Sequence, residues 1–380
     1  MKKCVLIVLS SILMVSGCNQ NKLHDGIIVI NDEDAIEVMF EDVANDINVV
    51  PIVSDEPIDE CIKYLVSGNE MLMLGMDSKT IYYFVDNELK GKLCAYGQGP
   101  NEYYAIKTFT YSPDEHIIYI VDSYTNKILS YITPEMKFHG KTDNSNTIQY
   151  IAEHDSNSFI TLMNSADNDS CFLQIIDKKD AKCKRVLMNA PFYTVGDADN
   201  TMSGYSKHNH SLALSAYINK IGTITDDGFQ CSLQFNYGDK NIPEDVMDFQ
   251  IGDVRGFPRL IEFANTPEAE LCLSGDMFPK VSKGTVSFWY QKAMGSIHEL
   301  SYYRNSNGNI VHYKGFHIPG INRNVSPFCN TEDGYVMVFQ GTSDMIRDYN
   351  TNPSDLALKI FDVMDHQIEN NPVLLFFNIK

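Results

Sequence analysis

From about residue 60 onward, the chain alternates between short runs of hydrophobic, β-branched and aromatic residues and polar turns. Runs of about 4 to 8 residues bounded by Gly, Asn, Asp or Ser are typical of β-strands. The first four runs are Ile62–Val66, Met71–Gly75, Ile81–Val85 and Lys92–Tyr96. This pattern predicts an all-β body.

The strand-like runs recur in groups of four. The second and third groups are Ala105–Thr110, Ile117–Val121, Lys127–Ile132, Met136–His139, Thr147–Ala152, Phe159–Met163, Phe172–Ile176 and Arg185–Met188. Four strands in about every 40 to 45 residues predict a β-propeller, because each of its blades is one four-stranded sheet. Less regular runs continue from Leu212 to Gln340 with a proline-rich interruption over 241–275, and six blades fit the chain.

The end of the chain predicts one short helix followed by a last strand. Ser354 can cap a helix whose apolar residues fall near one face, and Asn371-Pro372 ends it. Val373–Ile379 then reads as a closing strand. We expect the early strands Ile27–Ile30 and Ile47–Val53 to pair with it, because an unpaired outer strand would be an aggregation hazard.

The first 18 residues have the features of a bacterial lipoprotein signal. Met1-Lys2-Lys3 is basic, Cys4–Met14 is apolar but too short to span a bilayer, and Val15-Ser16-Gly17-Cys18 resembles a lipobox. An ordinary secretory signal with a chance cysteine is the alternative. We expect residues 1–17 to be a signal peptide, Cys18 to carry the lipid, 18–26 to be a linker, and 27–380 to form a single six-bladed propeller.

Removing the signal peptide changes the charge and the cysteine count. The net charge of −20 becomes −22, with 28 basic residues against 50 acidic residues, which argues against nucleic acid as a partner. Seven scattered cysteines remain without zinc-type spacing, so no metal site is expected from them. Cys171 and Cys183 flank a hairpin and could pair, although buried thiols are the expectation for most of the seven.

One loop carries a specific motif. Tyr96-Gly97-Gln98-Gly99-Pro100-Asn101-Glu102-Tyr103 resembles the G-x-GPGE-[FY] signature of TolB-like six-bladed propeller lipoproteins of Bacteroides-type bacteria, with Asn101 in place of glycine. Three further stretches, Phe40–Asp55, Ile221–Pro243 and Glu369–Lys380, also resemble segments of that family. The resemblance spans most of the chain and implies a lipid-anchored, six-bladed ring on the cell envelope.

The signature has a structural interpretation. Gly97 and Gly99 permit backbone conformations that other residues avoid, Pro100 fixes φ, and Asn101 tolerates positive φ. Glu102 can accept hydrogen bonds from neighbouring backbone amides. We therefore expect Gly97 to Tyr103 to shape the crossing from the first blade to the second. Gln98 and the rest of the loop could also line a ligand site near the central channel.

The sequence contains none of the common catalytic motifs. No HExxH, G-x-S-x-G, CxxCH or Walker loop is present, so no catalytic residue, cofactor or metal is assigned. His208 and His210 could present two imidazoles on one side of a strand, but a solvated pair is the simpler interpretation. Asp197–Asn200 departs from a calcium loop.

Adjacent aromatic residues could contribute to a ligand surface. Three pairs on predicted strands place one ring inward and one outward: Tyr103-Tyr104, Tyr302-Tyr303 and Trp289-Tyr290. The exposed rings could stack on sugars.

These observations predict a lipid-anchored, non-enzymatic binding module of the cell envelope. Its ligand is a glycan, a peptide or an envelope protein. Asn19 to Lys22 lack an acidic export-like run, which favours the periplasmic face of the outer membrane. The alternative is a hydrolase- or lyase-type enzyme with its site at the mouth of the central channel. A mouth that gathers carboxylates and histidines from several blades would favour that alternative.

Overall fold

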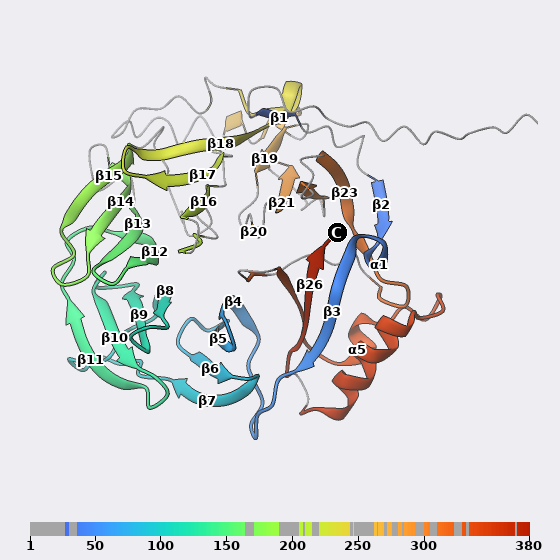
Figure 1. Ribbon diagram of the computed structural model, residues 1–380, viewed down its shortest axis with the longest axis horizontal. Helices are drawn as coiled ribbons and strands as arrows, with labels where there is room; N and C mark the ends of the chain where they lie inside the picture. Colours follow the sequence, from blue (N-terminus) through green and yellow to red (C-terminus); the bar gives the residue numbers. More distant parts are fainter. Residues whose placement is uncertain are drawn as a thin grey trace, which may run out of the picture.

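The strands form six sheets arranged as a ring around a central axis (Figure 1). The computed structural model describes residues 27–29, 36–163, 171–189, 205–207, 210–214, 220–243, 246, 262–263, 265–269, 272–275, 280–282, 285–292, 300–304, 310–322, 329–331, 334–368 and 371–380. The predicted all-β, six-bladed propeller is confirmed. The proposed signal peptide and linker, residues 1–26, lie outside the described residues.

Blades 1 to 3 are regular four-stranded antiparallel sheets, each running from the axis to the perimeter. Their strands are β4 (Cys61–Ser67), β5 (Glu70–Gly75), β6 (Ile81–Val85), β7 (Glu88–Leu93), β8 (Ile106–Ser112), β9 (Ile117–Asp122), β10 (Ile128–Ile132), β11 (Lys137–Thr142), β12 (Ile148–Asp155), β13 (Ser158–Met163), β14 (Cys171–Asp177) and β15 (Cys183–Asn189). All twelve overlap the expected runs. The largest shift is at β7, which begins four residues earlier than Lys92.

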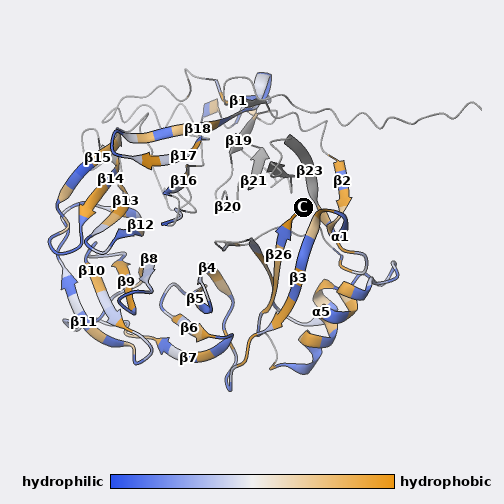
Figure 2. Ribbon diagram, viewed as in Figure 1, coloured by the Kyte–Doolittle hydropathy of each residue, from blue (hydrophilic) through white to orange (hydrophobic). Residues whose placement is uncertain are grey.

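Burial along these strands follows their place in the ring. Middle strands such as β5, β6 and β13 are buried at nearly every position, because neighbouring blades cover both faces of each sheet. The outer strand β11 instead alternates between exposed and partly buried residues, and it is correspondingly hydrophilic in Figure 2. The core is therefore a series of layers between blades.

Blades 4 and 5 each carry an additional outer strand from the N-terminal segment. Blade 4 contains β16 (Ser211–Leu214), β17 (Lys220–Thr225) and β18 (Gly228–Asn236), and blade 5 contains β19 (Leu273–Gly275), β20 (Lys280–Ser282), β21 (Thr285–Lys292), β22 (Leu300–Arg304) and β23 (Ile310–His317). On the perimeter, β1 (Ile27–Val29) pairs in parallel with β18, and β2 (Ile36–Met39) pairs in parallel with β23.

The ring closes in blade 6. This blade contains β24 (Cys329–Asn330), β25 (Tyr335–Phe339), β26 (Val373–Ile379) and the N-terminal strand β3 (Ala44–Pro51). Strand β3 pairs antiparallel with β26, with Val49 opposite Leu375. The expected pairing of Ile47–Val53 with the closing strand is confirmed. The expectation for Ile27–Ile30 is wrong, because β1 reaches blade 4 and stays on the perimeter.

The N-terminal segment thus forms a belt of outer strands on three consecutive blades. We call β1, β2, α1 (Phe40–Val43) and β3 the N-terminal belt. Phe40 is fully buried, and its ring packs edge-on against Phe316 and Phe377 at centroid distances of 5.7 and 4.9 Å. The belt is therefore held by side-chain packing as well as by strand pairing.

The C-terminal helix lies outside blade 6. Helix α5 (Asp355–His366) begins after Ser354, whose Oγ accepts a hydrogen bond from the Ala357 amide at 3.2 Å. Ile360 and Phe361 pack into the same core as Phe40. This confirms the predicted helix and its cap. The shorter α4 (Ser343–Ile346) precedes it.

The thiols show no disulfide among the described side chains. Cys61, Cys272 and Cys329 are buried, whereas Cys94, Cys183 and Cys231 are free and exposed. The suggested pairing of Cys171 with Cys183 is wrong, because Cys183 is free and its partner across the sheet is Ile176. Cys171 instead lies opposite Asn189, at the other end of the hairpin.

A repeated hydrogen bond defines one face of the ring. In blades 1 to 3, the amide directly after the third strand donates to the carbonyl directly before the second strand. The pairs are Asp86 to Asn69 (2.9 Å), Thr133 to His116 (2.9 Å) and Lys178 to Asn157 (3.0 Å). In blade 4, Ser206 bridges to Ser211 on the edge of β16 away from β17, and the corresponding bond runs from Ile224 in β17 to His210 directly before β16 (2.9 Å). We call this side the inner-turn face. The blade-to-blade crossings lie on the opposite side, the crossing face.

Candidate functional site

The signature loop lies where expected, in the crossing from β7 of blade 1 to β8 of blade 2. Its two ends are joined by backbone hydrogen bonds from Gly97 to Tyr103 (2.8 Å) and from Tyr103 to Ala95 (3.1 Å). These bonds close residues 97 to 103 into a compact loop. Gln98, Pro100 and Glu102 are exposed on its surface.

Tyr103 anchors this loop in the core. Its side chain is fully buried, its hydroxyl donates to the Lys79 carbonyl at 2.7 Å, and the same oxygen accepts the Ala95 amide at 3.2 Å. Its ring packs edge-on against Tyr131, whose hydroxyl donates to the Asn101 carbonyl at 2.9 Å. Burial raises the pKa of Tyr103, so the hydroxyl stays protonated. The loop is fixed to both blades.

Gly97 and Gly99 leave room for the Glu102 side chain, and neither has a backbone with positive φ. The Glu102 carboxylate accepts the Gly99 amide at 2.7 Å, as expected for this side chain. A Cβ on Gly97 would lie 2.1 Å from Glu102 Oε2, and a Cβ on Gly99 would lie 3.0 Å from it. None of Gly97, Gly99 and Asn101 has positive φ. The expected left-handed backbone is therefore wrong, and Asn101 replaces glycine without strain.

Gly97→Ala should lower the free energy of unfolding by about 1 kcal/mol. The added methyl group would displace the flexible end of Glu102 and break its hydrogen bond to the Gly99 amide. Gly140→Ala is the matched control, because its Cβ would meet only Ser130 Oγ at an ordinary 3.6 Å. Urea denaturation of both variants checks this. An equal effect of the two substitutions would contradict the assigned role of Glu102.

Three tyrosines are exposed beside the signature loop on the crossing face. Tyr96, Tyr104 and Tyr124 are 53%, 43% and 75% exposed. The rings of Tyr104 and Tyr124 lie 4.9 Å apart with planes at 39°, and Lys79 Nζ lies 5.0 Å from the centre of the Tyr96 ring. Tyr103 is buried and Tyr104 is exposed, as predicted, but the two residues lie in the crossing and not on a strand. The side chains of Trp289-Tyr290 and Tyr302-Tyr303 lie outside the described residues.

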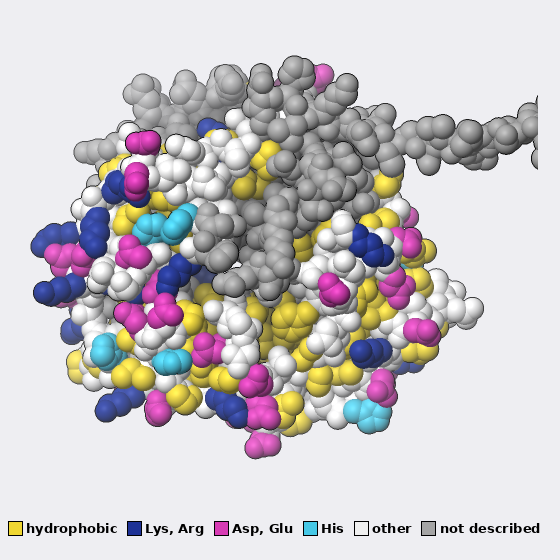
Figure 3. Space-filling view, in the orientation of Figure 1, with side chains coloured by type: hydrophobic (Ala, Val, Ile, Leu, Met, Phe, Trp, Pro, Cys, Tyr) yellow, Lys and Arg dark blue, Asp and Glu magenta, His cyan; other side chains and the backbone are white. Residues whose placement is uncertain are grey.

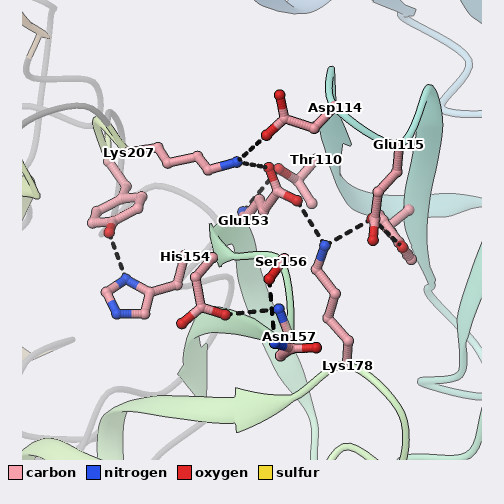
Figure 4. A network of polar contacts seen from close by, with 12 residues as sticks. Thr110, Asp114, Glu115, Glu153, His154, Ser156, Asn157, Lys178 and Lys207 are labelled. Carbon is pink, nitrogen blue, oxygen red and sulfur yellow. Dashed lines mark hydrogen bonds and ion pairs between the residues drawn. The ribbon is translucent and has the colours of Figure 1, made fainter.

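A second group of polar side chains lies on the inner-turn face, around the end of β12 (Figure 4). Glu153 is only 4% exposed, yet its two carboxylate oxygens lie 2.6 Å from Lys178 Nζ and 2.7 Å from Lys207 Nζ. Lys178 also contacts Glu115 at 2.8 Å, and Lys207 contacts Asp114 at 3.2 Å. We call these five residues the lysine–carboxylate cluster.

The cluster connects three blades. Asp114 and Glu115 belong to the turn after β8, Glu153 and Lys178 belong to blade 3, and Lys207 precedes β16 of blade 4. Burial alone would raise the pKa of Glu115, but hydrogen bonds from Lys178 and Tyr119 outweigh it and lower that pKa. For Lys207, burial is likewise outweighed, and its carboxylate partners raise its pKa. Both groups therefore stay charged at neutral pH.

His154, the next residue on β12, points away from the cluster toward blade 4, since successive side chains of a strand alternate. Its Nδ1 lies 2.6 Å from the Tyr205 hydroxyl, which lies 2.8 Å from His210 Nδ1. The two imidazole rings are 5.2 Å apart. Burial lowers the pKa of His154 and outweighs the opposing effect of the Asp155 carboxylate, so His154 is neutral at pH 7.

Stability should fall as the pH drops below about 6.5, because unfolded His154 takes up a proton there and folded His154 resists it. His154→Gln should make this fall shallower. His139→Gln, on the exposed outer strand β11, is the control and should keep the wild-type profile. Thermal unfolding between pH 5 and pH 8 measures the difference. Identical slopes for wild type and His154→Gln would show that His154 does not contribute.

The inner-turn face was not predicted from motifs. The sequence pattern relates His210 only to His208, which lies outside the described residues, as does Asp197–Asn200. Its partners Tyr205 and His154 are five and 56 residues away, so no short motif relates them. Among the described residues, no three His, Cys, Asp or Glu side chains are placed to hold a metal ion. Figure 3 shows histidines, lysines and carboxylates gathered on this face over blades 2 to 4.

The comparisons with known proteins agree with the ring. The chain matches the family described as "6-bladed beta-propeller" over residues 19–251, and it belongs to that family. A putative exported protein of Bacteroides fragilis has a similar structure, with a TM-score of 0.70, 14% identity, and coverage of 91% of this chain and 99% of the other. A DUF4221-family protein of Bacteroides vulgatus also has a similar structure, with a TM-score of 0.52 and 10% identity. The match covers 89% of this chain and 98% of the other. No curated protein sequence matches the chain.

Proposed function

We propose that this protein is a lipid-anchored binding module of the bacterial cell envelope, of the TolB-like lipoprotein group, that binds a neutral glycan on its crossing face. The anchor is the lipid on Cys18, and the periplasmic side of the outer membrane is the favoured location. The basic start, the apolar run and the lipobox support export, and one structural relative is described as a putative exported protein. No helix in the described residues is both long and apolar enough to cross a membrane.

The observation that carries the proposal is the group of exposed tyrosines beside a rigid loop. Tyr104 and Tyr124 are held by the crossing and by the β9–β10 turn, where Asp122 accepts the amides of Tyr104 and Thr125, each at 2.8 Å. Aromatic faces are electron-rich and pack well against the C–H groups of sugar rings, while the phenol hydroxyl supplies a hydrogen bond. Rigid tyrosines lose little entropy on binding.

Size and charge favour a neutral glycan over other ligands. The exposed parts of Tyr96, Tyr104 and Tyr124 amount to roughly 400 Å² of surface, about half of the ~800 Å² that each partner buries in a standard protein interface. That area suits a few sugar rings. The expected net charge of −22 would repel anionic glycans and phosphates.

A glycan array probed with the purified mature chain tests the ligand class. We expect neutral glycans to be retained, and Tyr104→Ala/Tyr124→Ala to abolish the signal. Tyr349→Ala, which removes a 72% exposed tyrosine elsewhere on the ring, should leave it intact. Glycan binding that survives the double substitution would show that these tyrosines are not the binding site. Retention of peptides or envelope proteins in place of glycans would show that the ligand is not a glycan.

The anchor has its own test. In cells fed labelled palmitate, the wild-type chain should be labelled and sediment with membranes, whereas Cys18→Ser should be unlabelled and soluble. Protease treatment of intact cells should leave a periplasmic protein uncut. An unlabelled wild-type chain would contradict lipidation, and cleavage on intact cells would place the ring outside.

A further inference from the structure

We propose that His154, Tyr205 and His210 form an acid–base site on the inner-turn face that hydrolyses acyl esters. This site lies on the face opposite the exposed tyrosines. The proposal therefore does not depend on whether those tyrosines bind a glycan. It matches the arrangement that the enzymatic alternative requires, since imidazoles, a phenol and charged groups converge there from neighbouring blades.

Hydrogen-bond counting assigns opposite tautomers to the two histidines. The Tyr205 hydroxyl has one proton and lies within hydrogen-bond distance of both Nδ1 atoms, at 2.6 and 2.8 Å. It can donate to only one of them and must accept a proton from the other. When both rings are neutral, the histidine that donates through Nδ1 has a free lone pair on Nε2. The other histidine carries a proton on its Nε2.

This pair can exchange protons with a substrate at two points. The basic Nε2 takes a proton from a water molecule as the water oxygen bonds to the ester carbonyl carbon. When the tetrahedral intermediate collapses, the carbon–oxygen bond to the alcohol breaks, and the leaving oxygen takes the proton from the other Nε2. A proton moves at the same time from the first Nδ1 to the Tyr205 oxygen, and the Tyr205 proton moves to the second Nδ1. Both imidazoles end neutral with exchanged tautomers.

The chemistry of these groups favours esters over other substrates. A neutral imidazole can activate water, but it is too weak a base for an unactivated C–H bond. Glycoside hydrolysis needs a carboxylic acid with a raised pKa, whereas the nearby carboxylates of Glu153, Glu115 and Asp114 are paired with lysines. Burial keeps His154 neutral and therefore competent as a base.

The surroundings hold the pair in place and leave it accessible. His154 is half-buried on β12, Tyr205 is half-buried, and His210 is exposed at the turn into β16. Ser206 bridges antiparallel to Ser211, which keeps Tyr205 and His210 close together. Asp155 and Arg185 are the other charged groups that act on His154. The cluster next to it fixes the end of β12.

Hydrolysis of ethyl acetate by the purified mature chain, followed as acid release in a pH-stat at pH 7.5, tests the proposal, because its alkoxide must be protonated as it leaves. We expect His154→Gln and His210→Gln each to lower the rate by about 100-fold, the typical contribution of general acid–base catalysis. Tyr205→Phe keeps both imidazoles but breaks the proton path, and it should also lower the rate. His139→Gln and His366→Gln, at exposed positions, should not. A wild-type rate no higher than that of the His154→Gln/His210→Gln double variant would overturn the proposal.

A spectroscopic measurement keeps the test valid if a variant folds poorly. Nitrogen-15 NMR of the wild-type chain, recorded at a pH at which both rings are neutral, should show His154 and His210 as opposite tautomers. Two identical tautomers would show that Tyr205 does not link the rings, and this result would also overturn the proposal.

Discussion

Phe40→Ala should lower the free energy of unfolding by about 4 kcal/mol, the cost of removing a fully buried aromatic side chain. Phe40 is 0% exposed in α1, between the belt strands β2 and β3, and its ring contacts Phe316 of blade 5 and Phe377 of blade 6. The substitution would leave a cavity where the N-terminal belt packs against β23 and β26. The whole ring should be destabilised, because β3 closes it.

Met39→Ala is the control for this experiment, since Met39 is the preceding residue and is 45% exposed. Its loss should cost less than about 1 kcal/mol. Guanidinium denaturation followed by circular dichroism measures both variants. If Phe40→Ala were as mild as Met39→Ala, the N-terminal belt would not be part of the folded ring.

Glu153→Ala should cost about 3 kcal/mol, because it leaves two ammonium groups without their shared buried partner. Lys178 is only 10% exposed and would retain Glu115 alone, while Lys207 would retain the exposed Asp114. The change removes a carboxylate that contacts lysines from both blade 3 and blade 4. Cooperativity between these blades should fall along with stability.

An exposed ion pair supplies the comparison. Glu88 pairs with Lys90 at the surface, with side chains 55% and 42% exposed, and Glu88→Ala should cost no more than about 0.5 kcal/mol. A double-mutant cycle between Glu153→Ala and Lys178→Met should show a coupling of at least about 1.5 kcal/mol. A coupling near zero would mean that the buried carboxylate is not held by Lys178.

The sequence was enough to predict the ring because the strand pattern is local. Residues such as Met71 to Leu74 are buried between blades, and their unbroken hydrophobic run shows in the sequence itself. Ser354 and Pro372 marked the final helix for the same reason. The paths of β1 and β2 could not be predicted, because their partners β18 and β23 are more than 200 residues away and short apolar runs do not specify their neighbours.

Of the two candidate sites, only the signature loop could be located from the sequence. The signature loop was located from its glycines, yet their role was misjudged, because the position of the Glu102 carboxylate beside Gly97 is visible only in three dimensions. Glu153, His154 and Tyr205 carried no signal in the sequence. Their partners come from other blades, and the ring alone brings them together.

Isothermal titration of the strongest neutral glycan from the array tests the central claim, that the crossing face of this ring is a glycan-binding surface. We expect Tyr104→Ala/Tyr124→Ala to weaken the affinity by about 10-fold or more, equivalent to about 1.4 kcal/mol, and Tyr349→Ala to leave it unchanged. Equal affinity of the wild type and the double variant would contradict this claim.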